Sequence, residues 1–443
     1  MDTTSTTAEY DRLIARHHAM RLRRQILAPA PSFPAAPEDP PSPPGGADGH
    51  DGCAGHDGAA DRRLILRDLA LVTPFDELID HLYACMFRRR PFLRALFPES
   101  MEFQQAHLER MLEYLIERLH RPDELAGTLA RLGRDHRKLG VRPVHYEAFE
   151  EALREAIRYR AGARWHAGLE AAWVRTLRFA VRSMVAGAEA ALPEPPYWHA
   201  TVVGHERRRH DLAVLRVRTG EPYPYRAGQY GTVEHPALPH TWRQYSMGCA
   251  PRADNELEFH VRRTGPGGVS AALVGSTAVG DRLRLGPPRG TLMPEDDTRD
   301  LLLVAGGTGL APMKAIVERL VEHRPRGQRV HLFVGARSRD ELYDWPALAE
   351  LGLRKPWLEL VPVTGDAGAE DVRAEGAGAG NAAGGRYAPG WRLAEAVGRA
   401  ADWSEHRACV SGPAGLVDEV RTRLAAAGLP AARIHHDPLP GRF

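Results

Sequence analysis

Three polar side chains, those of Tyr83, Gln104 and His136, occupy positions where the surrounding sequence calls for apolar residues. His136 belongs to a stripe spaced four and three residues apart, which is the spacing of one helix face: Leu125, Leu129, Leu132, His136 and Leu139. Gln104 begins a similar stripe that continues with Leu108, Met111 and Leu115, and Tyr83 stands four residues from both Ile79 and Phe87. A buried hydroxyl, amide or imidazole is costly unless a partner uses it. The pattern indicates either core residues with satisfied hydrogen bonds or a group such as a haem bound among these helices.

A second set of residues, further along the chain, has the chemistry needed to hold a flavin. It comprises the runs Ala227-Gly228-Gln229-Tyr230, Arg243-Gln244-Tyr245-Ser246 and Gly267-Gly268-Val269-Ser270. An arginine can pair with a flavin pyrophosphate, a tyrosine can stack on the isoalloxazine ring and a serine can hydrogen-bond near its N5. A glycine turn that opens a helix offers backbone N–H groups to phosphate. The motif Arg243-Gln244-Tyr245-Ser246 also occurs by chance, but its combination with the other two runs favours a flavin site.

Two glycine-rich turns near the C-terminus each follow a predicted strand. They read Gly306-Gly307-Thr308-Gly309-Leu310-Ala311-Pro312 and Ser411-Gly412-Pro413-Ala414-Gly415. The first turn opens a helix, and Pro312 suits the first helical turn. It is not the usual G-x-G-x-x-G dinucleotide fingerprint, and glycines after strands also serve as packing turns. Their order nevertheless favours a dinucleotide site.

Three regions of different periodicity must position these residues. Residues 64–192 have the spacing of helices. After Pro193-Glu194-Pro195-Pro196, short alternating runs at 198–203, 211–217 and 256–262 predict antiparallel strands in a barrel or sandwich. From Asp300, runs at 301–305, 330–334, 358–363 and 408–410 alternate with helical stretches, which predicts a parallel doubly wound sheet. The expected fold is multidomain: all-α, then an antiparallel β-barrel, then α/β.

The helical region resembles the globin of bacterial flavohaemoglobins. The run His81-Leu82-Tyr83-Ala84-Cys85-Met86-Phe87 is similar to the distal helix of that family, and Leu93-Arg94-Ala95-Leu96-Phe97-Pro98 is similar to the segment whose phenylalanine packs on the haem. Gln104 and Leu108 match the distal glutamine and leucine, and Arg134-Asp135-His136 with Tyr146 matches the proximal histidine and tyrosine. The later motifs resemble the R-x-Y-S, P-G-Q-Y, G-G-T-G-x-A-P and C-G-P-x-G segments of the family's ferredoxin-reductase-like module.

The resemblance implies a role for each matching residue. His136 would bind the haem iron, Tyr83 and Gln104 would hydrogen-bond dioxygen there, and Tyr146 would complete the catalytic set on the proximal side. Phe97 would pack on the porphyrin and Leu108 would restrict access. Binding of FAD and NAD(P)H would fall to Arg243, Gln244, Tyr245, Ser246, Gly267, Gly268, Val269, Ser270, Gly306, Gly307, Thr308, Gly309, Pro312, Ser411, Gly412 and Pro413. The implied domains are a disordered extension (1–63), a globin with haem b (64–192), an FAD-binding barrel (193–297) and an NAD(P)-binding domain (298–443).

The implied activity is nitric oxide dioxygenation, with electrons passing from NAD(P)H through FAD to haem and with small-molecule partners O2, NO and NAD(P)H. Two departures leave alternatives open. Ala188 stands where the family has a glutamate beside the proximal histidine, with Glu189 one residue later, and Leu439 stands where an aromatic residue covers the flavin. The alternatives are a haem-based gas or redox sensor, another flavin-coupled oxidation, and a reductase with a haem-free helical partner. Arg337 and Ser338 are positioned to contact a 2′-phosphate or simply to form a solvated turn, so NADH and NADPH both remain open.

The composition excludes several other classes. A net charge of +2, from 59 basic and 57 acidic residues, gives no general attraction to nucleic acid or membranes. The four cysteines form no C-x-x-C pair, which argues against a disulfide scaffold or a zinc site. His50, Cys53 and His56 could hold a metal only with a further ligand. The chain lacks a signal pattern and a membrane-spanning apolar run, so we expect a cytoplasmic protein that needs no protein partner.

Overall fold

The computed structural model describes residues 58–292, 298–365 and 389–437, and the chain divides into two compact units between Pro196 and Tyr197. That break lies four residues beyond the boundary predicted after residue 192. Among the described residues, the first helix begins at Gly58, six residues before the predicted start of the helical domain. The remainder of the predicted extension and most of the Ala/Gly-rich stretch 365–390 lie outside the described residues.

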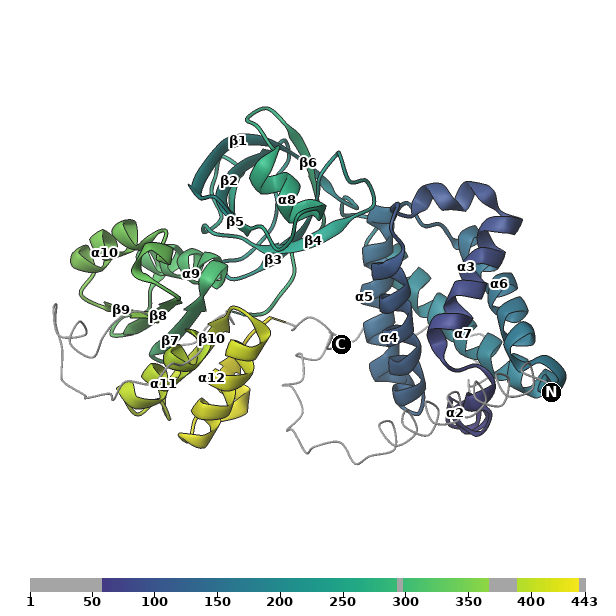
Figure 1. Cartoon of the computed structure of the whole chain (residues 1–443). Helices are drawn as coiled ribbons and strands as arrows, with labels where there is room; N and C mark the ends of the chain where they lie inside the picture. The colour runs from purple at the N-terminus through teal and green to yellow at the C-terminus, as the bar shows by residue number, and fades with distance from the viewer. Residues whose placement is uncertain (1–57, 293–297, 366–388, 438–443) are drawn as a thin grey trace, which may run out of the picture. The chain divides into compact units, whose positions relative to one another are not determined.

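The first unit is all-α, as the periodicity predicted (Figure 1). Its helices are α2 (Gly58–Arg67), α3 (Phe75–Arg89), α4 (Glu102–Arg118), α5 (Pro122–His136), α6 (Pro143–Ala161) and α7 (Ala167–Ala190). Proline opens α5 and α6, where its missing N–H costs nothing. The α-helix of the leucine stripe ends at His136, and Leu139 lies in a short 3-10 turn, where it is half-buried. The stripe therefore ends at the histidine.

The second unit begins with a six-stranded antiparallel sheet. Its strands are β1 (Trp198–Arg209), β2 (Leu212–Thr219), β3 (Tyr230–Glu234), β4 (Trp242–Ser246), β5 (Glu256–Arg262) and β6 (Arg282–Leu285), in the order β4-β3-β6-β1-β2-β5. A bridge between Met247 and Phe259 joins the two end strands, so the sheet closes into the predicted barrel. Helix α8 (Gly268–Gly275) packs on β2, β4 and β5. The short strand β6, with two arginines in four residues, was not predicted.

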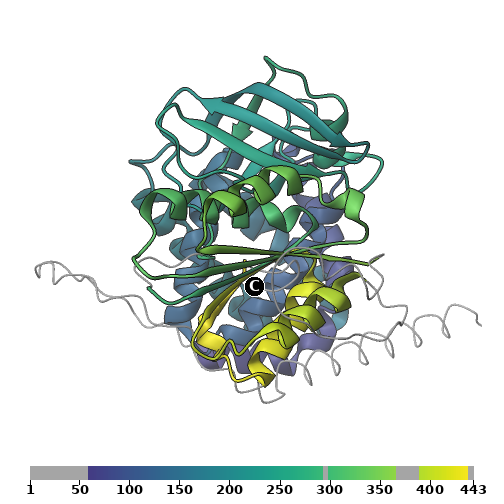
Figure 2. The same ribbon diagram turned by 90° about the vertical axis from the view of Figure 1, so that its left-hand side faces the viewer.

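The rest of this unit is a five-stranded parallel sheet, as predicted for the α/β region. Its strands are β7 (Leu301–Gly306), β8 (Val330–Ala336), β9 (Leu358–Thr364), β10 (Arg407–Ser411) and β11 (Ile434–His435), in the order β11-β10-β7-β8-β9. Helices α9 (Leu310–His323) and α10 (Trp345–Arg354) cover one face, and α11 (Pro389–Ala400) and α12 (Ala414–Ala426) cover the other (Figure 2).

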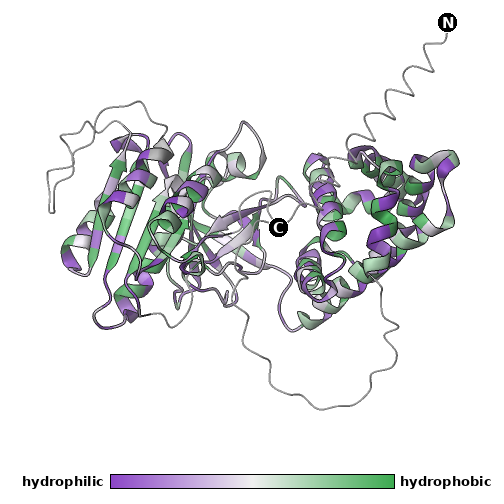
Figure 3. Ribbon diagram, turned by 90° about the horizontal axis from the view of Figure 1, so that it is seen from below, coloured by the Kyte–Doolittle hydropathy of each residue, from purple (hydrophilic) through white to green (hydrophobic). Residues whose placement is uncertain are grey.

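Burial on both faces explains why these strands read as apolar runs, most completely in β7, and they are largely hydrophobic in Figure 3. Successive residues of β7 enter opposite cores, Leu301 and Leu303 on one side and Leu302 and Val304 on the other. Among the described helices of both units, none combines the length and apolarity needed to cross a membrane.

Candidate functional site

His136 is the last residue of α5, and its imidazole is held in one orientation. Its Nδ1 lies 2.8 Å from the carbonyl oxygen of Leu132, one turn earlier in the same helix. Burial lowers the pKa of His136, and this effect is larger than the opposing effect of the hydrogen bond to Leu132. The neutral imidazole is therefore favoured. A neutral ring that donates from Nδ1 presents the lone pair of Nε2, which is the form that binds a metal.

The position of α5 is set by its crossing with α7. A Cβ added at Gly133 would lie 1.8 Å from the carbonyl oxygen of Met184, and one added at Gly187 would lie 2.1 Å from that of Ala130. Backbones can approach this closely only where the side chain is a hydrogen atom. His136 is therefore attached to a helix that rests directly on α7, and not on intervening side chains.

Helix α4 presents a polar face toward the same region. The side-chain oxygen of Gln104 is buried and has no hydrogen-bond partner among the described residues. His107, one turn further, has a lowered pKa because of burial and, less strongly, because of the charges of Arg110 and His136. The two histidines of α4 and α5 are thus close enough to influence each other. Sequence reasoning missed His107, although its spacing of three from Gln104 places it on the same helix face.

Tyr83, on α3, belongs to an aromatic cluster. Its ring centroid lies 5.9 Å from that of Phe87 and 5.6 Å from that of Phe97, and Phe87 and Phe97 are 5.3 Å apart. Burial raises the pKa of Tyr83 well above its usual value, so the hydroxyl is a proton-bearing donor. Phe97 and Leu108 are half-buried against the same core. In the same core, burial raises the pKa of Tyr146, on α6, to about 12.

These residues fit a haem. The Nδ1 of His136 is hydrogen-bonded to the carbonyl oxygen of Leu132, so its Nε2 is the nitrogen left for an iron ion. The side-chain oxygen of Gln104 is buried and has no hydrogen-bond partner among the described residues. Glu189 is exposed on α7, so the carbonyl of Leu132 takes the place that a carboxylate would otherwise have beside His136. This agrees with the sequence, in which Ala188 stands where the family has a glutamate.

The predicted flavin residues lie on two paired strands of the barrel. In the register of β3 and β4, Tyr230 is opposite Ser246, Gly231 is opposite Tyr245 and Val233 is opposite Arg243. Tyr245 is half-buried on the barrel core, and burial raises its pKa well above the usual range. Gln244 points outward and is exposed.

The second flavin motif opens α8, which contacts β4. Gly268 has a φ of +81°, and a Cβ added at Gly267 or Gly268 would meet no atom within 4 Å, so there is open space beside the start of this helix. Ser270 Oγ lies 3.2 Å from the Thr264 N–H and 3.1 Å from the Thr264 hydroxyl, so it shapes the preceding loop. Val269 is buried in the barrel core. The start of α8 and Arg243 fit the pyrophosphate of FAD, and Tyr245 fits its ring.

The two coenzyme loops meet at the carboxyl ends of the neighbouring strands β7 and β10. A Cβ at Gly309 would lie 2.2 Å from the carbonyl oxygen of Ser411, and one at Gly412 would lie 3.2 Å from the Cα of Gly306. Gly307 has a φ of +57°, which glycine adopts without strain. The turn then runs through Thr308 into α9, with Pro312 in the first turn, and Pro413 precedes α12. Parallel strands gather both loops at one edge, the usual place for a dinucleotide.

Side chains on one face of β5 contact α9 and the loop at Gly307. The side chains of Glu258 and His260 are buried, and Glu258 Oε1 accepts hydrogen bonds from Lys314 of α9 at 2.7 Å and from His260 at 2.9 Å. Burial alone would raise the pKa of Glu258, but His260 and Lys314 lower it to about 2. Arg262, next on the same face, lies beside Gly307: a Cβ there would be 3.7 Å from Arg262 Nη1.

The C-terminal segment returns to the flavin strands. Asp437 Oδ1 lies 2.7 Å from where a Cβ of Gly290 would be, and Gly290 also abuts Tyr230. This oxygen is buried without a hydrogen-bond partner among the described residues, and burial raises the pKa of Asp437 to about 7. Leu439, which stands where the family has an aromatic residue over the flavin, lies outside the described residues. Arg337 forms an ion pair with Glu341, at 2.5 Å between Nη2 and Oε1.

Comparison with known proteins gives three family matches in the order of the structure. Residues 80–184 match the globin family, residues 199–293 the oxidoreductase FAD-binding domain and residues 303–421 the oxidoreductase NAD-binding domain. The ferredoxin–NAD(P)+ reductase component of the naphthalene 1,2-dioxygenase/salicylate 5-hydroxylase systems of Ralstonia sp. is 32% identical over 247 residues, which are 54% of this chain and 67% of that protein. The chain spans 48% of the corresponding naphthalene 1,2-dioxygenase reductase of Pseudomonas putida.

Relatives that match across both units are flavohaemoproteins. That of Xylella fastidiosa is 25% identical over 379 residues, covering 81% of this chain and 91% of the relative. The flavohaemoglobin of Malassezia yamatoensis, solved with bound FAD and haem, has the same fold, with a TM-score of 0.64 and 19% identity over 85% of this chain and 98% of that one. The globin and the two reductase domains thus occur together and in this order. The chain belongs to the flavohaemoglobin family, as an NAD(P)H-dependent oxidoreductase in which electrons pass from NAD(P)H through FAD to a globin-bound haem.

Proposed function

We propose that the chain is a nitric oxide dioxygenase that uses NAD(P)H to convert nitric oxide and dioxygen to nitrate. The observation that carries the proposal is the neutral imidazole of His136, fixed through Nδ1 and close to the polar face of α4, in a chain that also carries both coenzyme loops. When bound, FAD and haem supply the redox chemistry, which relays electrons singly from NAD(P)H to the iron where the two gases combine.

The chain's own residues would position the reactants and stabilise charge. The hydroxyl of Tyr83 remains protonated and, with the amide of Gln104, would donate hydrogen bonds to oxygen atoms that gain negative charge. Phe97 and Leu108 would exclude water from the distal side. Arg243 and the open N-terminus of α8 would hold the flavin phosphates, and Tyr245 its ring.

The test is the yield of nitrate from purified full-length protein carrying haem and FAD. We expect nitric oxide to be consumed over many cycles in air, with two nitrates formed for each NADH oxidised, because each turnover needs one electron. His136→Ala should abolish nitrate formation, whereas His120→Ala, at an exposed position of the same unit, should not. Negligible nitrate from protein with an intact Soret band would contradict the proposal.

A second candidate function is a haem-based sensor. It is favoured by the partner of His136, which is the carbonyl of Leu132 while Glu189 is exposed. A carbonyl makes an imidazole less electron-rich than a carboxylate does, and this suits reversible ligand binding. Stopped-flow mixing with NADH distinguishes the two: rapid haem reduction with sustained nitric oxide turnover supports the enzyme, and binding without turnover supports the sensor.

A further inference from the structure

Helices α3 and α6 bring together three side chains of metal-binding type that have no place in the haem or coenzyme sites. His81 and Cys85 are one turn apart on α3, and Glu155 faces them from α6. A ring nitrogen of His81, the Sγ of Cys85 and a carboxylate oxygen of Glu155 all lie within 4.8 Å of one another. This group could not be predicted from local sequence patterns, because Glu155 is 70 residues from Cys85.

The three side chains are held in place by packing. The His81 ring stacks on Tyr159 of α6, with ring centroids 4.0 Å apart and an interplanar angle of 6°. No hydrogen bond to a ring nitrogen of His81 is found among the described residues. Cys85 is fully buried, with its Sγ 3.1 Å from Glu155 Oε1. Tyr83 lies two residues from both His81 and Cys85, about 200° around the helix, so this cluster and the haem-side hydroxyl are on opposite faces of α3.

We propose that His81, Cys85 and Glu155 form a zinc site. Imidazole, thiolate and carboxylate are the three ligand types that Zn2+ takes from proteins, and three protein ligands leave a fourth position for water. Binding removes the Cys85 thiol proton to solvent, forms the Zn–S bond and replaces a hydrogen bond to Glu155 by a Zn–O bond. The thiolate and the carboxylate together balance the charge of the ion.

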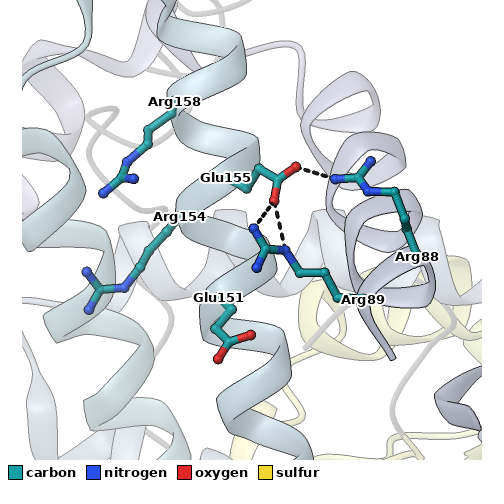
Figure 4. A pocket seen from close by; sticks show the side chains of 6 residues that line it. All are labelled: Arg88, Arg89, Glu151, Arg154, Glu155 and Arg158. Atoms are coloured by element: carbon teal, nitrogen blue, oxygen red, sulfur yellow. Dashed lines mark hydrogen bonds and ion pairs between the residues drawn. The ribbon is translucent and has the colours of Figure 1, made fainter. Parts of the chain in front are cut away.

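Two arginines form ion pairs with the carboxylate of Glu155 (Figure 4). Arg88 is paired with Oε1, and Arg89 donates to Oε2 at 2.6 and 2.9 Å. Arg88 Nη2 also lies 3.4 Å from Cys85 Sγ. Their side chains are 60% and 47% exposed, so they can turn into solvent at little cost. Zinc and the arginines therefore compete for the same carboxylate.

Of the three ligands, Glu155 is the one that borders a cavity, whereas Cys85 is fully buried. Glu155 lines a cavity of about 470 Å³ together with Glu151 and four arginines: Arg88, Arg89, Arg154 and Arg158. Zinc bound there would join α3 to α6 and add a crosslink to the first unit. The structure thus leads to two measurable effects, stoichiometric binding and a rise in the unfolding temperature.

The experiment is equilibrium dialysis of the full-length holoprotein against zinc chloride, with metal analysis and thermal unfolding of the same samples. One zinc per chain and a higher Tm are expected. Cys85→Ser and Glu155→Gln should each weaken binding at least tenfold and abolish the Tm rise, with His81→Gln as a third variant in case one of them misfolds. Glu151→Gln, in the same helix and cavity, should bind as the wild type does.

Replacement of the two arginines tests the proposed competition for Glu155 directly. Arg88→Gln combined with Arg89→Gln should bind zinc more tightly than the wild type, because the competing cations are gone. Binding that is absent, or unchanged by Cys85→Ser, would overturn the proposal. Loss of the site in a His50→Gln, Cys53→Ser, His56→Gln variant would overturn it as well, since the N-terminal residues would then be the ligands.

Discussion

Gly133 of α5 and Met184 of α7 are in direct backbone contact, with only 1.8 Å between the position of a Cβ at 133 and the carbonyl oxygen of Met184. The reciprocal contact of Gly187 with Ala130 makes the approach symmetrical. The helix that ends in His136 is thus fixed by its own backbone. Any side chain at the crossing must push α5, and the imidazole with it, away from α7.

Gly133→Ala should therefore destabilise the first unit by about 1–3 kcal/mol and weaken haem retention, because overpacking forces the helices apart. Gly127→Ala, exposed on the same helix, is the matched control: its Cβ would meet only Arg131 Nη1, at 3.9 Å. The control should be stabilised by about 0.5–1 kcal/mol, because alanine is the better helix former. Thermal unfolding and haem transfer to apomyoglobin measure both effects. Equal behaviour of the two variants would contradict the close-contact explanation.

Tyr83→Phe removes a hydroxyl and keeps the ring that packs on Phe87 and Phe97. If this hydroxyl hydrogen-bonds dioxygen, its loss should cost about 1–1.5 kcal/mol, which is roughly a tenfold faster dissociation of dioxygen. Rapid mixing of the oxygenated protein with a ligand trap measures the rate. Tyr114→Phe, the same change on α4 where the hydroxyl lies 3.3 Å from Thr128 Oγ1, should leave the rate unchanged. An unchanged rate in Tyr83→Phe would remove this residue from the distal site.

Gly309→Ala should impair coenzyme binding, because its Cβ would lie 2.2 Å from the carbonyl oxygen of Ser411 and must separate the two loops. Displacement of a binding group by about 1 Å can cost orders of magnitude in rate, so we expect the KM for NADH to rise roughly tenfold or more. Gly398→Ala, exposed on α11, would place its Cβ 3.9 Å from side-chain atoms of Arg423 and should leave this KM unchanged. Steady-state reduction of ferricyanide by NADH reports on this step without the haem. A wild-type KM in Gly309→Ala would show that the loops tolerate separation.

Asp437 should make the stability of the second unit depend on pH. Burial raises its pKa from 3.8 to about 7, so the folded protein holds this proton more tightly than the unfolded chain does. Its contribution to stability is present at low pH and is lost as the pH rises through 7. Asp437→Asn should therefore raise Tm relative to the wild type more at pH 8 than at pH 5, measured on FAD-free protein. The exposed control Asp340→Asn should show no such difference, and equal shifts of Asp437→Asn at both pH values would refute the assignment.

Much of this architecture was predictable because local patterns decide it. Strand β5 spans the residues expected from alternation, and the parallel strands were evident because burial on both faces demands apolar runs. The spacing of Leu125, Leu129 and His136 predicted a helix face with an inward imidazole, which α5 confirms. The roles of Tyr83, Gln104 and Tyr146 remain predictions from the family resemblance.

Other features were invisible because they join distant parts of the chain. The influence of His136 on His107 depends on how α4 and α5 pack, and the pairing of Glu258 with Lys314 depends on how the barrel meets α9. Alternation in β5 would place Glu258 and His260 on a solvent-facing side, yet a second layer covers them. The start of α2 at Gly58 was missed because the preceding composition is so poor in apolar residues.

The buried pair of Glu258 and Lys314 makes the barrel and the parallel sheet poor candidates for separate expression. Severing the chain between β6 and β7 would separate Glu258, which would keep only His260, from Lys314, which would keep only Asp344, and would expose the surfaces that now cover these groups. Calorimetry should accordingly show the reductase half melting cooperatively, in one endotherm. A chimera that joins the barrel of one relative to the NAD-binding domain of another would therefore have to keep both Glu258 and Lys314.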